Sequence, residues 1–465
     1  MNAAKNAFEF WKNPPADYRG APFWSWNSKL DPQRLVRAVE SMYAAGMGGF
    51  FMHARYGLKT PYLSEEWFAC VSACVEKARE LGMKAYLYDE DRWPSGCAGG
   101  LVTRDHANLR SHSLRVRPAA EPDKDADRLA AFAVELDEQG RMKSYRATED
   151  GAPPAAGSTI AFDLITAEPS PWHNDGTCQD ALNPKATAEF IRVTHRAYAD
   201  RFGNDFGGLI PAIFMDEPNY AEGWSSHSKN TPGAYYLPWT PNLPLEFKKR
   251  RGYDIREHLP ELASPPAGDD GFVKARYDHR KTITELFVEN FTEQIGRWCG
   301  KHNIALTGHM LSEESLTSQT RCIGAAMPHY EYMQWPGIDL LTDSYQTKEL
   351  CIAKQCTSVA DQLGKPRAIT ELYGCTGWDW PLEGHKFIGD WEFACGINFR
   401  VPHLTHYSLA GGAKRDYPAS IFSHSPWWNC YSVVEDYFGR LSYMLTQGTP
   451  VRDVLVIHPV ESAWG

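Results

Sequence analysis

The chain has 465 residues, and its 58 acidic and 48 basic side chains give a net charge of −10. This balance offers no basic footprint, so nucleic acid is not an expected partner. No apolar run is long enough to span a membrane, and the first residues lack the apolar core of a signal peptide. We therefore expect no membrane partner and a cytoplasmic location. The eleven scattered cysteines fit buried thiols in a reducing compartment, and the sequence makes no prediction of oligomeric state.

Strands and helices alternate through the first hundred residues. The expected strands cover residues 21–27, 48–54 and 84–88, with helices over 31–46 and 64–82 between them. Alternation at this spacing indicates parallel βαβ units. The strands run into polar or aromatic side chains, namely Asn27, His53, Asp89, Glu90, Asp91 and Trp93.

The alternation then breaks over about sixty residues. Four short runs that are β-branched or alternate in polarity cover residues 113–116, 129–136, 142–146 and 159–165. They predict a small antiparallel β insertion between the third strand and its helix. The alternation of strands and helices resumes with a helix expected over residues 184–202. Residues 221–244 are expected to form a long aromatic loop.

Five more strands follow, and most end in groups that can do chemistry. They are expected over residues 213–217, 304–310, 338–342, 368–371 and 398–407. Their ends carry Asp216, Glu217, His309, Asp343, Tyr345, Glu371, Trp378, His403 and His406. Eight strands, each followed by a helix and ending in polar residues, predict an α/β fold, a (β/α)₈ TIM barrel, with its site at the carboxyl ends of the strands.

The pattern divides the chain into four parts. Residues 1–109 are expected to form barrel strands one to three, residues 110–170 the β insertion, and residues 171–448 the remainder of the barrel. Residues 451–459 read as a further buried strand. We therefore interpret 449–465 as the start of a truncated C-terminal domain.

Glu217 and Glu371 are the central pair of the hypothesis. Strands four and seven lie on opposite sides of a barrel mouth, so their terminal carboxylates can converge on one bond. Cleaving a glycosidic bond requires two such carboxyl groups, one holding a proton and one ionised. Asp216 would then orient a sugar hydroxyl or tune Glu217. In the structural alternative, Asp216 and Glu217 organise a loop and Glu371 pairs with an arginine such as Arg367.

Other residues at the strand ends are assigned to substrate binding. They are Asn27, His53, Asp89, Glu90, Trp93, Asp216, His309, Tyr345, Trp378 and His406. The tryptophans are candidates for stacking on a sugar ring. The run 89–91 can instead bind a hard cation or form a solvated acidic turn. No zinc-protease, dinucleotide, P-loop or serine-hydrolase motif is present in the sequence.

Several motifs resemble those of a known group of enzymes. The stretches PFWSWN (22–27), GGFFMHARYGLKTPYLSEEW (48–67), YDEDRWPSG (88–96), MDEPNY (215–220) and TELYGCTGW (370–378) resemble bacterial glycoside hydrolases related to the family 106 α-L-rhamnosidases. The resemblance implies inverting hydrolysis, with Glu217 and Glu371 at the positions of the catalytic glutamates. It also implies calcium near the bound sugar, with no ligand set carried over to this sequence, and β-sandwich domains after the barrel.

Together these observations predict a glycosidase that removes a terminal sugar, such as an α-L-rhamnoside, from oligosaccharides. Action at a chain end is inferred from the loop 221–244 and the insertion, which can wall the pocket. One alternative is a metal-dependent sugar isomerase or epimerase with Glu217, Glu371, His309 and an aspartate as ligands. The other is a barrel that binds sugar without turning it over.

Overall fold

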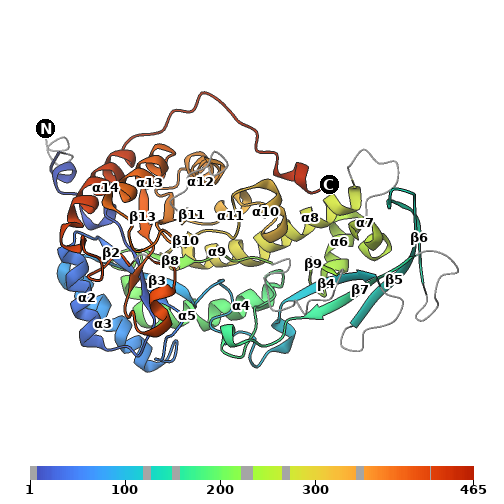
Figure 1. Ribbon diagram of the computed structural model, residues 1–465, viewed down its shortest axis with the longest axis horizontal. Coiled ribbons are helices and arrows are strands. Elements are labelled where there is room, and N and C mark those ends of the chain that lie inside the picture. Colours follow the sequence, from blue (N-terminus) through green and yellow to red (C-terminus); the bar gives the residue numbers. More distant parts are fainter. Residues whose placement is uncertain are drawn as a thin grey trace.

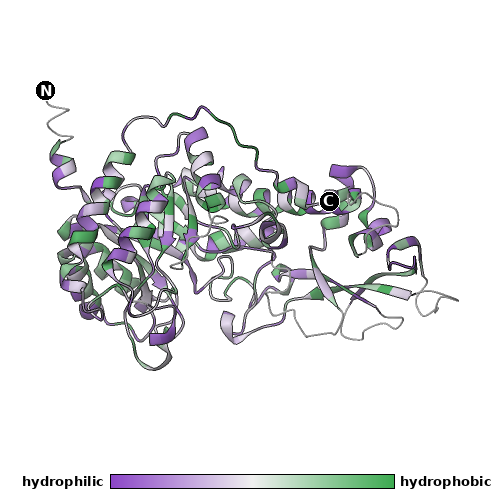
Figure 2. Cartoon of the chain, turned by 45° about the horizontal axis from the view of Figure 1, so that its top comes forward, coloured by the Kyte–Doolittle hydropathy of each residue, from purple (hydrophilic) through white to green (hydrophobic). Residues whose placement is uncertain are grey.

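The computed structural model describes residues 8–118, 127–148, 158–220, 234–263, 273–341, 350–418 and 420–465. Its strands form two sheets, one of nine strands and one of five. The larger sheet makes a barrel at one end of the molecule, and the smaller sheet extends from the other end (Figure 1). Figure 2 shows apolar residues concentrated on the barrel strands, with hydrophilic residues along the helices around them.

The barrel strands are parallel and closely follow the predicted ones. In sheet order they are β13 (Phe399–Pro402), β12 (Ile369–Leu372), β11 (Trp335–Leu340), β10 (Ala305–Gly308), β8 (Ala212–Met215), β3 (Lys84–Asp91), β2 (Gly49–Ala54), β1 (Phe23–Trp26) and β14 (Thr405–His406). The predicted eighth strand is split into β13 and β14, and β14 pairs with β1. That pairing brings the two ends of the sheet together, so the TIM-barrel prediction is confirmed.

Helices cover the outside of the barrel (Figure 1). They are α2 (Pro32–Ala44), α3 (Glu65–Leu81), α4 (Pro184–Val193), α5 (His195–Phe202), α8 (Lys274–Phe287), α9 (Gln294–Lys301), α10 (Leu316–Cys322), α11 (Met327–Tyr330), α12 (Leu350–Gln362), α13 (Leu382–Ala394) and α14 (Ser432–Leu445). Asp31, Ser64 and Asn183 cap the starts of α2, α3 and α4 by accepting backbone N–H groups. The predicted helix over 184–202 is interrupted at Thr194, whose hydroxyl donates to the Phe190 carbonyl.

The insertion is an antiparallel sheet with five strands rather than four. Its order is β6 (Met142–Ala147), β5 (Asp127–Leu136), β7 (Ser158–Thr166), β4 (His112–Pro118) and β9 (Tyr235–Trp239). Strand β9 lies within the segment that we expected to be a loop. It is an edge strand, a position that tolerates Pro238, and it pairs with β4 more than a hundred residues earlier in the chain. Sequence patterning cannot show such a distant partner.

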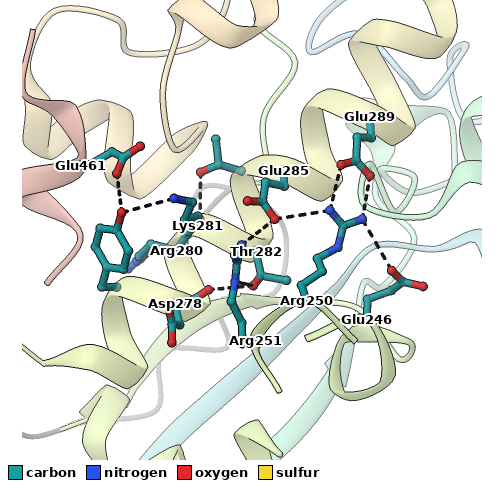
Figure 3. Close-up of polar contacts among 12 residues, drawn as sticks. Glu246, Arg250, Arg251, Asp278, Arg280, Lys281, Thr282, Glu285, Glu289 and Glu461 are labelled. Atoms are coloured by element: carbon teal, nitrogen blue, oxygen red, sulfur yellow. Dashed lines mark hydrogen bonds and ion pairs between the residues drawn. The ribbon is translucent and has the colours of Figure 1, made fainter. Parts of the chain in front are cut away.

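A network of ion pairs joins helix α6 (Leu243–Arg251), which follows β9, to the barrel helix α8 and to the π-helical turn Val288–Glu293 that continues it (Figure 3). Arg250 donates to both carboxylate oxygens of Glu289, at 2.8 and 2.6 Å, and to Glu285 at 3.3 Å. Arg251 donates to the same Glu285 oxygen at 2.5 Å and to Thr282 at 3.0 Å. Two adjacent arginines therefore hold α6, the helix that follows the insertion strand β9, against the barrel.

Residues 451–459 form no strand in this structure, so the expectation of a buried strand is wrong. The side chains of Val454, Leu455, Val456 and Ile457 are 81–89% exposed. The segment arches from α14 toward α8 and α10 (Figure 1). It is fixed by the buried Trp464, which donates to the Gly324 carbonyl at 3.1 Å. A further domain after residue 449 stays a prediction.

A buried ion pair fastens the eighth strand to the last helix. Arg400 of β13 donates to Glu435 of α14 at 2.6 Å, and the second Glu435 oxygen accepts the Gly20 N–H at 2.8 Å. Both side chains are at most 1% exposed. Replacing Glu435 with Gln should destabilise the protein by about 3–5 kcal/mol, because it leaves an uncompensated buried guanidinium. Thermal or denaturant unfolding measures this loss.

Glu289→Gln is the matched control, because it breaks an ion pair whose carboxylate is 44% exposed. It should cost less than about 1 kcal/mol. Equal effects from the two variants would show that Arg400–Glu435 is not a key contact of the barrel.

Candidate active site

The acidic motif after β8 is held in an unusual backbone conformation. The backbone of Glu217 has a φ of 47°, in the left-handed region, and the chain leaves the direction of β8 at the following Pro218. Asp216 is 5% exposed, and its backbone exchanges two hydrogen bonds with Ser95, both of 2.8 Å. Non-glycine residues in this region persist where the surroundings fix them, often at functional sites. The turn sends Asp216 into the barrel and leaves Glu217 on the cavity wall.

His309 lies between two carboxylates from different strands. Its Nε2 is 2.8 Å from Glu371 Oε2 and 3.2 Å from Asp216 Oδ1, and the ring is fully buried. The Tyr88 hydroxyl donates to the other Asp216 oxygen. The preceding Gly308 allows this approach, because a Cβ there would lie 1.8 Å from the Met215 carbonyl oxygen. The ends of β8, β10 and β12 therefore meet at one imidazole.

The ionisation of this group follows from burial and charge. Burial, and then the negative charges of Asp216 and Asp339, raise the pKa of Glu217 to about 8. Burial and Asp216 also raise the pKa of Glu371 to about 7, although the hydrogen bond from His309 opposes them. Burial lowers the pKa of His309, but its bonds to Asp216 and Glu371 outweigh burial and hold that pKa well above the usual value. A pKa of about 8 leaves Glu217 protonated near neutral pH.

Two acids of the cluster were missed by sequence reasoning. Asp339 of β11 lies in register with Glu371 of β12, and burial followed by the Glu371 charge holds its pKa well above the usual range. The predicted strand began three residues later than β11, so Asp343 was assigned to the strand end in place of Asp339. An acidic residue inside an apolar run was the signal that could have identified Asp339. Glu313 accepts from the Met310 N–H at 2.8 Å and the Tyr330 hydroxyl at 2.6 Å.

Histidines from two other strand ends, those of β2 and β13, lie beside this cluster. His53 stacks on the Tyr88 ring at 3.7 Å, and neither of its ring nitrogens has a hydrogen-bond partner within the described residues. His403 lies 3.6 Å from Glu371. Burial, followed by the charge of Arg55, keeps the pKa values of His53 and His403 well below the usual value, so both are neutral. Neutral imidazoles with unused nitrogens can bind sugar hydroxyls.

A cavity of about 470 Å³ opens beside Glu217. Its lining includes the aromatic side chains Trp93, Trp172, Tyr220 and Tyr417. Arg55 stacks on Trp93 at 4.5 Å and pairs with Asp416 at 2.7 Å, which fixes one wall. Glu371 is not among the residues that line the described cavity and is 4% exposed. It pairs with His309, whereas Arg367 bonds to Asp17, Ser442 and Asn398.

Two predicted substrate-binding residues have structural roles instead. The Asn27 amide donates to the Ser408 carbonyl and accepts the Ser408 N–H, both at 2.9 Å, which fastens β1 to the chain after β14. Glu90 is 1% exposed, and its two oxygens accept the N–H groups of residue 91 and of residues 96–99. Their polar groups are already used, so we correct both assignments.

The remaining predicted residues are placed as follows. The Asp89 Oδ1 accepts from Ser95 at 2.5 Å, and its Oδ2 is buried without a partner within the described residues. His406 bonds to the Asp416 carbonyl at 3.1 Å and lies 6.3 Å from the ring of Trp378, which is 42% exposed. Tyr345, like Asp343, lies outside the described residues.

The implied calcium ion does not fit these residues. Calcium takes six to eight oxygen ligands. Within the described ranges, potential metal-binding side chains gather in two groups of three, and each contains a histidine. In the group of Asp216, His309 and Glu371, the His309 nitrogen occupies the space between the carboxylates. The run 89–91 forms no such group, and we derive no step through calcium.

Comparison with known proteins agrees with this geometry. Residues 162–462 match the model of glycoside hydrolase family 106, described as alpha-L-rhamnosidase. The chain belongs to glycoside hydrolase family 106. None of the helices in the described part of this family 106 chain has the length and apolar character needed to cross a membrane.

Two known proteins are similar to this family 106 chain, one in sequence and one in fold. A protein of Formosa agariphila named "Putative beta-glucuronidase" is 28% identical over 295 residues, which are 62% of this chain and 23% of that protein. The structure of a rhamnosidase from Novosphingobium sp. PP1Y aligns with a TM-score of 0.66 at 15% identity, over 95% of this chain and 61% of that one. This second likeness shows the fold alone. The chain therefore spans less than two thirds of either relative.

The charge of Asp216 should be visible in the titration of Glu217. Asp216→Asn should lower the Glu217 pKa from about 8, since a negative charge that opposes its ionisation is removed. Carbon-13 NMR of labelled glutamate carboxyl groups measures this pKa, and loss of the signal in Glu217→Gln assigns it. Asp200→Asn, on the exposed side of α5, should leave the titration unchanged. An unchanged Glu217 pKa in Asp216→Asn would contradict this electrostatic account.

Proposed function

We propose that this family 106 barrel hydrolyses the glycosidic bond of a terminal α-L-rhamnoside in an oligosaccharide. The observation that carries the proposal is the cluster around His309, in which Glu217 holds a proton beside a cavity while Glu371 is paired with a cationic imidazole. The pKa of Glu371, about 7, lies below that of Glu217, about 8, and glycoside hydrolysis needs one ionised and one protonated carboxyl group. The family match supports the substrate class.

In the proposed reaction, Glu217 donates its proton to the glycosidic oxygen as the bond to the anomeric carbon breaks. Glu371 removes a proton from a water molecule that attacks the opposite face of the sugar, so the carboxyl group lost at one residue is regained at the other. His309 holds Glu371 in place and stabilises its charge through the 2.8 Å bond. Burial, and then the negative charge of Asp216, keeps Glu217 protonated.

The sugar would bind against the aromatic wall of the cavity. Trp93 and Tyr417 line the cavity together with Glu217, and the guanidinium group of Arg55 stacks on both rings, at 4.5 and 5.7 Å. Two guanidinium nitrogens of Arg55 bond to Asp416, at 2.7 and 3.1 Å, so this cation is already neutralised. That pairing supports a neutral sugar over a glucuronide. Glucuronides remain the natural competitor in a substrate screen, given the name of the Formosa relative.

We also propose a cytoplasmic location. All eleven cysteines lie in the described part of the chain, and none of them forms a disulfide. Reduced thiols in this number suit a reducing compartment. Fractionation of the source cells, with activity on aryl rhamnosides as the readout, tests this placement.

Replacing Glu217 with Gln should separate the acid role from other defects. The variant should lose most activity on natural rhamnosides, whose leaving groups need a proton, by about 10²–10⁴-fold. The activity on nitrophenyl rhamnoside should fall far less, because its leaving group departs without protonation. Comparison of kcat/KM on the two substrates measures the difference. Equal losses on both would remove the acid assignment.

The proposed stereochemistry is inversion, which requires about 6.5–9.5 Å between the two carboxyl groups to admit a water molecule. Proton NMR of the product formed in the first minutes should show the anomer opposite to that of the substrate. Retention of configuration would instead make Glu371 a nucleophile, at a separation of about 5–5.5 Å.

A further inference from the structure

A second group of reactive side chains lies on the wall of the same cavity, away from the carboxylate cluster. Cys97, His173 and Cys178 each line the cavity, and their ligand atoms all lie within 4.8 Å of one another. The His173 Nε2 is 3.2 Å from the Cys178 Sγ. Cys97 follows β3, whereas His173 and Cys178 follow the insertion strand β7. Neither thiol nor the imidazole takes part in the proposed hydrolysis.

The loop that carries Cys97 is rigidly positioned. Glu90 accepts the N–H of Cys97 at 2.7 Å and those of its neighbours Gly96 and Ala98 at 3.1 and 2.7 Å. Buried carboxylates that accept several backbone N–H groups fix the loop that supplies them. Cys97 is itself 2% exposed. Its sulfur is therefore placed by the backbone before any ligand binds.

The segment that carries the other two residues is tied to this loop. Thr177 exchanges two 2.9 Å hydrogen bonds with the Thr103 hydroxyl, and the Asn174 amide donates to Asp91 at 2.9 Å and to the Gly99 carbonyl at 3.1 Å. Trp172 donates to the Trp93 carbonyl at 2.7 Å. The two loops thus form one preorganised wall, with two sulfurs and one nitrogen converging on a point.

Two thiolates and one imidazole are the ligands that zinc prefers. Zinc bonds are about 2.3 Å long to sulfur and about 2.0–2.1 Å long to nitrogen, so the ligand atoms around a tetrahedral zinc ion lie about 3.3–3.8 Å apart. The two sulfur atoms and the nitrogen atom of this group reach those separations with small side-chain movements. We propose that Cys97, His173 and Cys178 bind a zinc ion that ties the two loops together. The thiol protons pass to solvent on binding, and the fourth position faces the cavity, where water completes the tetrahedron.

The proposed zinc site is independent of the proposed hydrolysis, because it involves different side chains and is detected by a different signal. No recognisable spacing links residues 97, 173 and 178, so the sequence contains no zinc signature. The group of Asp216, His309 and Glu371 lacks sulfur. A metal bound there would give no absorption from thiolate-to-metal charge transfer, whereas one bound by the cysteines would.

The test uses the full chain, reduced and freed of metal, titrated with cobalt(II) as a spectroscopic substitute for zinc. We expect one tightly bound cobalt per chain, an intense near-ultraviolet charge-transfer band, and its loss when zinc is added. Zinc should also raise the midpoint of thermal unfolding, because it binds only the folded chain. Absence of the charge-transfer band in the reduced wild-type protein would overturn the proposal.

Variants assign the band to the three residues. Cys178→Ser and His173→Gln should each weaken cobalt binding by about 100-fold or more, since even groups that support ligands contribute about 10–100-fold. Cys430→Ser changes an exposed cysteine, and Glu371→Gln changes the other candidate group; both should keep the band. A band retained at wild-type affinity in Cys178→Ser, or a Cys97–Cys178 disulfide found by mass spectrometry in place of metal, would contradict the assignment.

Discussion

The site depends on the buried imidazole of His309, whose positive charge offsets the negative charge of several carboxylates. Asp216, Glu217, Asp339 and Glu371 gather at the carboxyl ends of the strands, where burial and the neighbouring charges raise the pKa values of Glu217, Asp339 and Glu371. His309 bonds to two of them and remains charged, so β8, β10 and β12 can bring their termini together without prohibitive repulsion. Glu217 lines the cavity, and its pKa of about 8 leaves it protonated near neutral pH.

The wall around this centre is made by parts of the chain that are not barrel strands. The loop after β3 is fixed through Glu90, and the segment after the insertion is fastened to it through Asn174 and Thr177. Helix α6, which follows the insertion strand β9, is in turn held to the barrel through Arg250 and Arg251 (Figure 3). A rigid barrel floor and a preorganised wall keep catalytic groups in position without relying on isolated loops.

The sequence predicted the eight strands because each is a short apolar run that ends in polar groups, and this pattern is local. The roles of individual polar residues are not local. Asn27 and Glu90 stand at strand ends like the other residues assigned to the site, but their groups are used by Ser408 and by the backbone of residues 96–99. Asp339 was missed by an error in strand register, and β9 because its partner lies far away in sequence. Pairing across the chain decides these cases.

The exposed segment Val454–Ile457 has a consequence for how the protein behaves in solution. Four consecutive β-branched or leucine side chains without charge form the kind of run that pairs edge to edge between molecules. The net charge of −10 opposes such encounters at low ionic strength. Salt screens this repulsion over about 8–10 Å. Colloidal stability of the isolated chain should therefore decline as ionic strength rises, although the fold itself is unchanged.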